Sequence, residues 1–138
     1  MSGPTGNGER LSGRDASGSR PVRSYEDLDG WQMAVQIAED TYAATQGFPK
    51  DETFGLRSQM RRASVAVASN IAEGWGRNSR KDYVRFLRIA RGSLYELKTQ
   101  IEIARRVGLL EQPASERLRE SSDRAGRVLH GLIRSLDP

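Results

Sequence analysis

The sequence predicts an all-α protein, an antiparallel up-down-up-down four-helix bundle. Four segments repeat apolar residues at the four-three spacing of one helix face, and no segment shows the two-residue alternation of a β-strand. Short connections separate the four segments, which favours antiparallel neighbours. The long, unbroken four-three spacing also favours near-parallel packing over the steeper helix crossings of globin-like folds.

Residues 1–23 differ in composition from the rest of the chain, because they contain five glycines and Leu11 is almost their only apolar anchor. Such a segment buries too little surface to offset the entropy cost of ordering it. We therefore expect a disordered, Gly/Ser/Arg-rich tail over residues 1–23 and one folded domain over residues 24–138. The tail's arginines could attract phosphates weakly, but a solvated linker is the simpler interpretation.

The first helix is expected to begin near Asp27 or Asp29, either of which can cap it, and to stop at residues 47–49. Its expected buried face is Trp31, Val35, Ala38, Tyr42 and Thr45. The second helix is expected to run from residues 51–53 to Trp75. Its expected inward series is Leu56, Met60, Ala63, Val67, Asn70 or Ile71, and Gly74. The many small residues in this helix should let a neighbouring helix approach closely.

Residues 74–78 are expected to form a turn, with glycines suited to the end of a helix. Ser79 and Asp82 then resemble a capping box for the third helix, which is the longest. Its core stripe is strongly amphipathic: Tyr83, Leu87, Ala90, Leu94, Leu97, Ile101 and Ala104. Pro113 is well placed in the first turn of a fourth helix. That helix is expected to bury Leu118, Ser122, Ala125, Leu129, Leu132 and Leu136.

Composition narrows the classes of protein to consider. A chain of 138 residues fits one domain, and it contains no cysteine for a disulfide or a thiolate metal site. It lacks a run of about 18 apolar residues and an apolar signal-peptide core, so we expect a cytoplasmic protein without a membrane contact. The charges are segregated: residues 25–52 carry seven acids and one base, whereas residues 53–107 carry twelve bases and four acids.

Several motifs follow one another in a fixed order. The two longest are Gln59-Met-Arg-Arg-Ala-Ser-Val-Ala-Val-Ala-Ser-Asn-Ile-Ala-Glu-Gly74 and Ile89-Ala-Arg-Gly-Ser-Leu-Tyr-Glu-Leu97. The shorter ones are Tyr25-x-x-Leu28 with Trp31-Gln32, Phe48-Pro49 with Glu52 and Gly55-Leu56, and Arg77, Ser79 and Tyr83 after the first long motif. Together they span residues 25–132. The ordered set resembles a bacterial family of small four-helix-bundle proteins, the 23S rRNA intervening-sequence proteins.

This resemblance implies a four-helix bundle that assembles into a ring-shaped homo-oligomer, with a pentamer as the expected size. Distantly similar bundles are accessory subunits of reverse transcriptases in diversity-generating retroelements, where they bind nucleic acid. The resemblance therefore implies two kinds of partner, namely RNA or single-stranded nucleic acid and a larger protein. Residues 1–23 lie outside the matched region, and nothing carries over to them.

Basic residues at the start of the third helix are the candidate nucleic-acid-binding set: Arg77, Arg80, Lys81, Arg85, Arg88 and Arg91. At about 100° per residue most of them fall opposite the apolar core stripe, and Arg106 continues that side. A column of bases along roughly 40 Å of helix can track a phosphate backbone, and its binding would depend strongly on salt. Two alternatives stay open, a seam that meets the acidic first helix of a neighbouring subunit and a plain solvated face.

The remaining polar candidates favour structural roles. Asn70 and Glu73 are expected to bond backbone groups at the end of the second helix, and Glu96 is expected to pair with an arginine such as Arg62 or Arg91. Trp75 is expected to pack over a loop or an interface rather than to stack on a base. His130 has no Ser, Cys or Asp constellation nearby, and no acid stands three residues before it as a di-iron bundle would require. We therefore expect that the protein is not an enzyme and that it has no metal site and no cofactor.

Overall fold

The computed structural model describes residues 13–14 and 21–138, and within them the chain forms four α-helices. The helices are α1 (Asp29–Thr45), α2 (Leu56–Gly76), α3 (Arg80–Arg106) and α4 (Gln112–Leu136). Two 3₁₀ turns accompany them, η1 (Tyr25–Asp27) before α1 and η2 (Lys50–Glu52) before α2. Two very short strands, β1 (Gly13–Arg14) and β2 (Pro21–Val22), pair antiparallel, with Gly13 opposite Val22.

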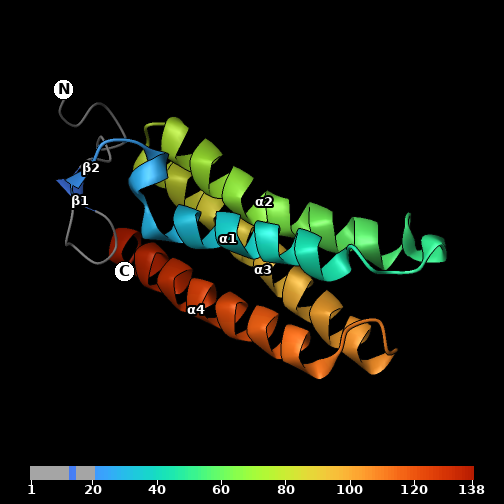
Figure 1. The fold of residues 1–138 in the computed structure, drawn as a ribbon. Coiled ribbons are helices and arrows are strands. Elements are labelled where there is room, and N and C mark those ends of the chain that lie inside the picture. The colour runs from blue at the N-terminus through green and yellow to red at the C-terminus, as the bar shows by residue number, and fades with distance from the viewer. Residues whose placement is uncertain (1–12, 15–20) are drawn as a thin grey trace.

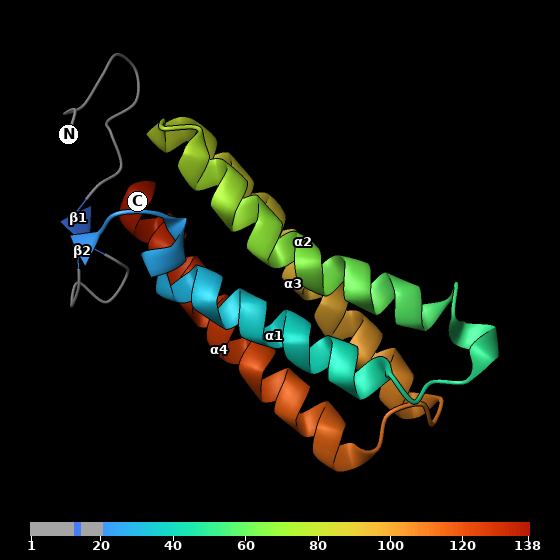
Figure 2. The ribbon, with the colours of Figure 1, turned by 45° about the horizontal axis from the view of Figure 1, so that its top comes forward.

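Successive helices run in opposite directions along one common axis (Figures 1 and 2). Each helix packs against its neighbours in the sequence, and α4 closes the bundle against α1. The contact between α2 and α3 is the most extensive, whereas that between α1 and α4 is the least extensive. This arrangement confirms the predicted all-α, up-down-up-down four-helix bundle.

The apolar core follows the predicted stripes closely in three helices. All seven predicted residues of α3 are buried. In α2 the inward residue is Ile71 rather than Asn70, which is only half-buried. In α4 the series is buried as far as Leu129, after which Ile133 is buried and Leu132 and Leu136 pack at the edge of the core.

The buried face of α1 is shifted by one residue position from the predicted one, except at Thr45, which is buried as predicted. It consists of Gly30, Ala34, Ile37, Thr41 and Thr45, while most of the predicted series lies on the flank. Two threonines can face inward because each hydroxyl donates to a carbonyl one turn earlier, Thr41 to Ile37 at 2.7 Å and Thr45 to Thr41 at 2.8 Å. Tyr42 instead points outward and is 45% exposed.

The helix starts agree with the sequence only in part. Neither predicted aspartate caps α1, because its N-cap is Leu28, which makes no side-chain cap. Helix α2 begins later than predicted, at Leu56, whose backbone N–H donates to the Glu52 carboxylate at 2.8 Å. The predicted cap of α3 is confirmed, because the Ser79 hydroxyl accepts from the Asp82 N–H at 3.4 Å.

The turn predicted at residues 74–78 begins later than expected, at residue 77, because α2 continues through Gly76. Gly74 stays helical, and a Cβ at this position would lie 2.6 Å from the Cβ of Phe86 in α3. The residue with a left-handed backbone conformation, at which the chain reverses, is Asn78, with φ of 61°. At the end of α3, Gly108 takes this role with φ of 83°.

The predicted tail over residues 1–23 lies mostly outside the described residues. Among its described residues, Val22 is 6% exposed and belongs to the apolar core, so the packed domain includes residues before position 24. No helix in the described ranges, 13–14 and 21–138, combines the length and the apolar character needed to cross a membrane.

Candidate nucleic-acid interface

Three of the six predicted basic residues line one shallow hollow on the outer face of α3. Lys81, Arg85 and Arg88 lie on successive turns of the helix, and the hollow, of about 500 Å³, is completed by Asp82 and Ile89. All three basic side chains are exposed. The helical spacing therefore brings these three cations together, as the sequence predicted.

Two of these three cations already have carboxylate partners within the chain. Arg85 lies 3.8 Å from Asp82 one turn earlier, and Arg88 reaches across to Asp137 at the end of α4, at 2.5 Å. Both pairs are about half exposed, so solvent screens them and each contributes little to stability. Among the described residues, Lys81 makes no ion pair.

Arg77, Arg80 and Arg91 lie outside this hollow. Arg77 follows the end of α2, pairs with Glu73 at 3.0 Å and stacks over Phe86 with 4.9 Å between its guanidinium carbon and the ring centroid. Arg80 is the first residue of α3 and is exposed. Arg91 is half-buried and faces α4, where its guanidinium lies 3.4 Å from Nδ1 of His130. Arg85 also stacks over Phe86, at 4.5 Å, so Arg77 lies beside the hollow, whereas Arg91 turns away from it toward α4.

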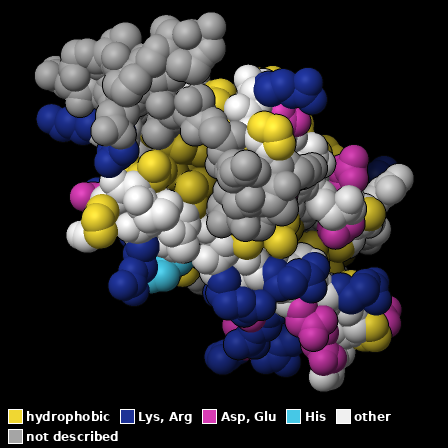
Figure 3. Space-filling view, turned by 90° about the vertical axis from the view of Figure 1, so that its left-hand side faces the viewer, with side chains coloured by type: hydrophobic (Ala, Val, Ile, Leu, Met, Phe, Trp, Pro, Cys, Tyr) yellow, Lys and Arg dark blue, Asp and Glu magenta, His cyan; other side chains and the backbone are white. Residues whose placement is uncertain are grey.

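Basic and acidic side chains lie together at the end of the bundle where α3 starts and α4 finishes, with Asp82 beside Arg85 and Asp137 beside Arg88. Figure 3 views the molecule from this end and shows further Lys and Arg side chains gathered among Asp and Glu in the lower part of the view, with the histidine beside one basic group. At the other end of α3, Glu102 accepts hydrogen bonds from Arg105 and Arg106, which lower the pKa of its carboxyl to about 2. Arg106 is therefore also internally paired.

The second half of the outer face of α3 has exposed apolar side chains among charged ones. Tyr95 is 58% exposed, Ile103 44% and Val107 63%. Tyr95 and Ile103 line a hollow of about 820 Å³ together with the charged side chains of Lys98, Glu102, Arg106 and, from α4, Arg119. Between the basic half and this half stands Gly92, where an added Cβ would meet no atom within 4 Å.

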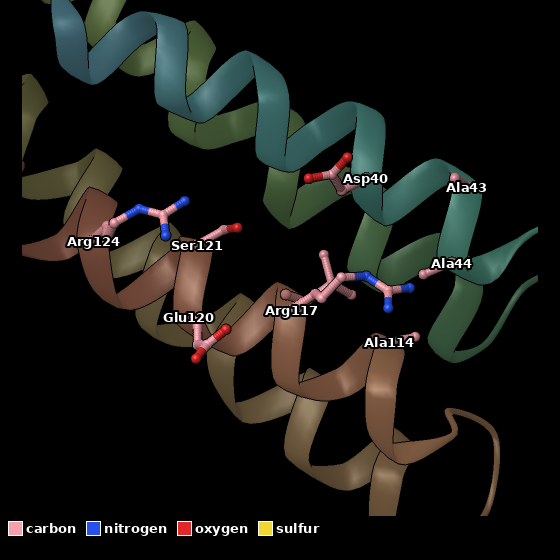
Figure 4. A pocket seen from close by; sticks show the side chains of 9 residues that line it. Asp40, Ala43, Ala44, Ala114, Arg117, Glu120, Ser121 and Arg124 are labelled. Atoms are coloured by element: carbon pink, nitrogen blue, oxygen red, sulfur yellow. The ribbon is translucent and has the colours of Figure 1, made fainter.

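A groove of about 620 Å³ separates α1 from α4, where the bundle is least tightly closed. Its floor is built of small and apolar side chains, including Ala44, Ala114 and Leu118. Figure 4 shows Asp40 of α1 on one side, with Arg117 and Arg124 of α4 on the other. The groove therefore offers both signs of charge over an apolar base.

A further basic cluster lies at the start of α2, and sequence reasoning did not single it out. Arg57, Arg61 and Arg62 line a hollow of about 420 Å³ together with Tyr42, Thr53 and Ser58. The signal in the sequence is the spacing Arg57-x-x-x-Arg61-Arg62, which places the three guanidinium groups on adjacent helical turns.

The predicted structural polar residues have partners that differ in part from expectation. The Asn70 amide donates to the backbone carbonyl of Ala66 at 2.8 Å, as expected for a backbone contact. Glu73 pairs with Arg77 instead of bonding the backbone, and Glu96 accepts from the Gln100 amide at 3.4 Å rather than from an arginine. Both carboxylates are exposed, so neither needs the buried partner that the sequence argument assumed.

Trp75 packs edge-on against Tyr83, with ring centroids 5.8 Å apart, and contacts the core. This position agrees with the predicted packing role. Among residues 13–14 and 21–138, no group of three or more His, Asp and Glu side chains is arranged to hold a metal ion.

Comparison with known proteins identifies a matching family and a solved structure with a similar fold. A family model described as 23S rRNA-intervening sequence protein matches residues 26–131. A crystal structure of a Bacteroides thetaiotaomicron protein of unknown function, from the S23 ribosomal protein family, is similar to this chain with a TM-score of 0.69. The two chains are 19% identical, and the similarity covers 76% of this chain and 95% of the other. No curated protein matches this chain significantly.

Proposed function

This chain belongs to the 23S rRNA-intervening sequence protein family, and from that premise we propose that it is a non-enzymatic, oligomeric, cytoplasmic bundle that binds structured RNA or single-stranded nucleic acid. The observation that carries the proposal is the hollow on α3, where Lys81, Arg85 and Arg88 lie together on one exposed face. The family name, which refers to ribosomal RNA, supports a ligand of this class.

Binding at this hollow is electrostatic. Lys81 offers an ammonium without an ion-pair partner among the described residues, while Arg85 and Arg88 hold their carboxylates in exposed, weak pairs. A phosphate can therefore replace Asp82 or Asp137 as the partner of an arginine at little cost. Each phosphate contact releases counterions from the nucleic acid, so affinity should fall steeply with salt. The hollow supplies charge and shape but no pattern that reads bases.

Self-association raises the affinity of such a weak site. The second half of the outer face of α3, with Tyr95, Ile103 and Val107 exposed, offers a surface for a second copy of the chain. A pentamer, the size implied by the family resemblance, would present five basic hollows to one ligand. Linked sites of this kind convert weak contacts into avidity.

The test is a salt titration with labelled structured RNA and the variant K81E/R85E/R88E. We expect tight binding by the native protein at about 50 mM salt, a steep negative log–log slope, and loss of binding in the variant. The matched control, R124E/R127E/R134E, reverses three exposed α4 arginines and should still bind. Helicity and mass are checked for both, because a triple variant that loses its oligomeric mass would identify the hollow as a subunit seam.

The second candidate is a protein-binding scaffold or an accessory subunit of a larger enzyme such as a reverse transcriptase. The groove between α1 and α4 favours it, because an apolar floor edged by Asp40, Arg117 and Arg124 suits a protein surface. A partner that remains bound on pull-down after nuclease treatment, and that is lost in the R117E/R124E variant, would support this role.

A further inference from the structure

The hollow at the start of α2 differs from the α3 hollow in its charge balance. Its lining contains three arginines, Arg57, Arg61 and Arg62, and no carboxylate. Over its 21 residues α2 has one acid, Glu73, which lies near its far end and pairs with Arg77. The three guanidinium groups therefore stand together without a nearby acid on their own helix.

Arg61 is held in place by the end of α1. Its Nε donates to the Thr45 hydroxyl at 2.9 Å, and a terminal nitrogen donates to the backbone carbonyl of Tyr42 at 3.2 Å. Its guanidinium carbon also lies 4.3 Å from the centroid of the Tyr42 ring. These contacts fix the position of one cation at the centre of the hollow.

Arg57 and Arg62 flank this fixed cation and make no hydrogen bond or ion pair with the described residues. Arg57 stands one turn before Arg61, and Arg62 stands one turn after the Ser58 hydroxyl. Guanidinium groups are planar forks that match the oxygens of a phosphate, and a hydroxyl adds a further donor. The hollow therefore has the donors of a phosphate site, and no acid lines it, since the nearby Glu52 carboxylate is held by the backbone N–H of Leu56.

Exposed aromatic rings accompany these arginines. Phe54 is 94% exposed and directly follows Thr53 of the hollow, and Tyr42, over whose ring Arg61 stacks, is 45% exposed. Unpaired bases stack on such rings, whereas the bases of a duplex are already stacked on one another. A basic groove beside an exposed aromatic side chain is the usual combination in proteins that bind single strands.

We propose that this corner of the bundle binds a single-stranded segment of nucleic acid, with phosphates on Arg57 and Arg62 and an unpaired base on Phe54. This inference rests on the proposed function, because it selects the single-stranded form within the same class of ligand. The corner is a separate site, because its lining shares no residue with that of the α3 hollow and the starts of the antiparallel helices α2 and α3 lie at opposite ends of the bundle. One strand that contacts both sites would therefore extend along the bundle.

The experiment compares labelled oligouridine with a blunt RNA duplex by fluorescence anisotropy, across a salt series, with the full chain. Three variants are used: F54A, R57Q/R62Q and K81Q/R85Q/R88Q. The control is R127Q/R134Q, which removes two exposed α4 charges. Arg61 is left unchanged because it joins α1 to α2.

We expect F54A to weaken oligouridine binding at least about fivefold and to leave duplex binding unchanged, because the ring stacks only on unpaired bases. R57Q/R62Q should reduce the salt slope for oligouridine by about 1.4, or about 0.7 for each lost phosphate contact. The control should move neither quantity. Circular dichroism and mass should match the native protein in each variant.

The possible results separate the two proposals. If K81Q/R85Q/R88Q weakens binding while F54A and R57Q/R62Q bind oligouridine like the native protein, the corner is not a binding site and the α3 proposal stands. Binding to the duplex without binding to oligouridine would likewise overturn the single-strand assignment. If the native protein binds neither RNA at low salt, the proposed function fails and the corner site fails with it.

Discussion

Gly74 of α2 and Phe86 of α3 lie so close that a Cβ on Gly74 would stand 2.6 Å from the Cβ of Phe86. Tyr83 adds a second restriction, because its ring would be 3.2 Å from the same added atom. The contact is between Cβ positions, so no rotamer change of Phe86 can relieve it. The glycine therefore sets how closely the two most extensively packed helices approach.

Gly74→Ala should destabilise the bundle even though alanine is the better helix former. Forcing the helices apart costs about 1–3 kcal/mol, which outweighs the gain of about 1 kcal/mol in helix propensity. The measurement is urea unfolding followed by circular dichroism. Gly76→Ala is the control, because a Cβ there meets no atom within 4 Å and the substitution should stabilise instead. Equal effects of both substitutions would contradict the close approach.

Asp137→Asn should strengthen nucleic-acid binding at the α3 hollow. The Asp137 carboxylate holds Arg88 and competes with phosphate for it, so its neutralisation frees one guanidinium. We expect a tighter complex at low salt, because a phosphate no longer has to displace the Asp137 carboxylate from Arg88. Asp123→Asn is the control, since Asp123 pairs with Lys98, away from the hollow. An affinity of D137N equal to that of the native protein would contradict phosphate binding by Arg88.

The double variant Y95E/I103E should dissociate the proposed oligomer. Two buried carboxylates in an apolar seam would be costly to desolvate, whereas on a free surface they are harmless. Light scattering after size-exclusion chromatography should then give the monomer mass of 15.4 kDa. Val65→Glu is the control, because Val65 is also exposed, at 41%, but stands on α2. An oligomer that survives Y95E/I103E would place the seam elsewhere.

Tyr83→Phe should remove a loss of stability at alkaline pH. Burial raises the pKa of the Tyr83 phenol well above its ordinary value of 10, so the native state keeps the proton. The unfolded chain releases this proton above pH 10, so ionisation of Tyr83 favours the unfolded state. The free energy of unfolding is therefore not reduced by Tyr83 below pH 10 and falls as the pH rises beyond it.

The comparison uses urea midpoints of native protein and Y83F at about pH 8 and about pH 11. Because the buried Tyr83 hydroxyl has no hydrogen-bond partner among the described residues, Y83F should be at least as stable near pH 8. At pH 11 it should be the more stable protein. Tyr42→Phe, at an exposed position outside the proposed seam, is the control and should not change the difference between the two pH values. A Y83F protein that is less stable at both pH values would contradict this account.

The four-helix bundle could be predicted because its main evidence is periodic and local. The stripe of α3 repeats long apolar side chains on one face and polar ones on the other, so only one orientation buries it. The Ser79 cap is equally local, because the Ser79 hydroxyl accepts a hydrogen bond from the backbone N–H of Asp82, only three residues later. The sequence also placed Lys81, Arg85 and Arg88 on one outer face for the same reason.

Features that depend on neighbouring helices could not be read from the chain. The face of α1 was misplaced by one position because Trp31 and Val35 look more apolar than Gly30 and Thr41, yet space beside α2 and α4 admits the smaller residues. The sequence favours a turn at Gly74, because only the approach of Phe86 explains a glycine inside a helix.

The sequence by itself thus determined the four helices, most of their buried faces and the basic character of the middle of the chain. The tertiary structure decided which basic residues are already paired, since Asp137 reaches Arg88 across 49 positions. It also brought Tyr42 of α1 into contact with Arg61 and into the same hollow as Arg57. The physical reason is that helical periodicity is a property of adjacent turns, whereas ion pairing and surface hollows depend on distances between helices, which only packing sets.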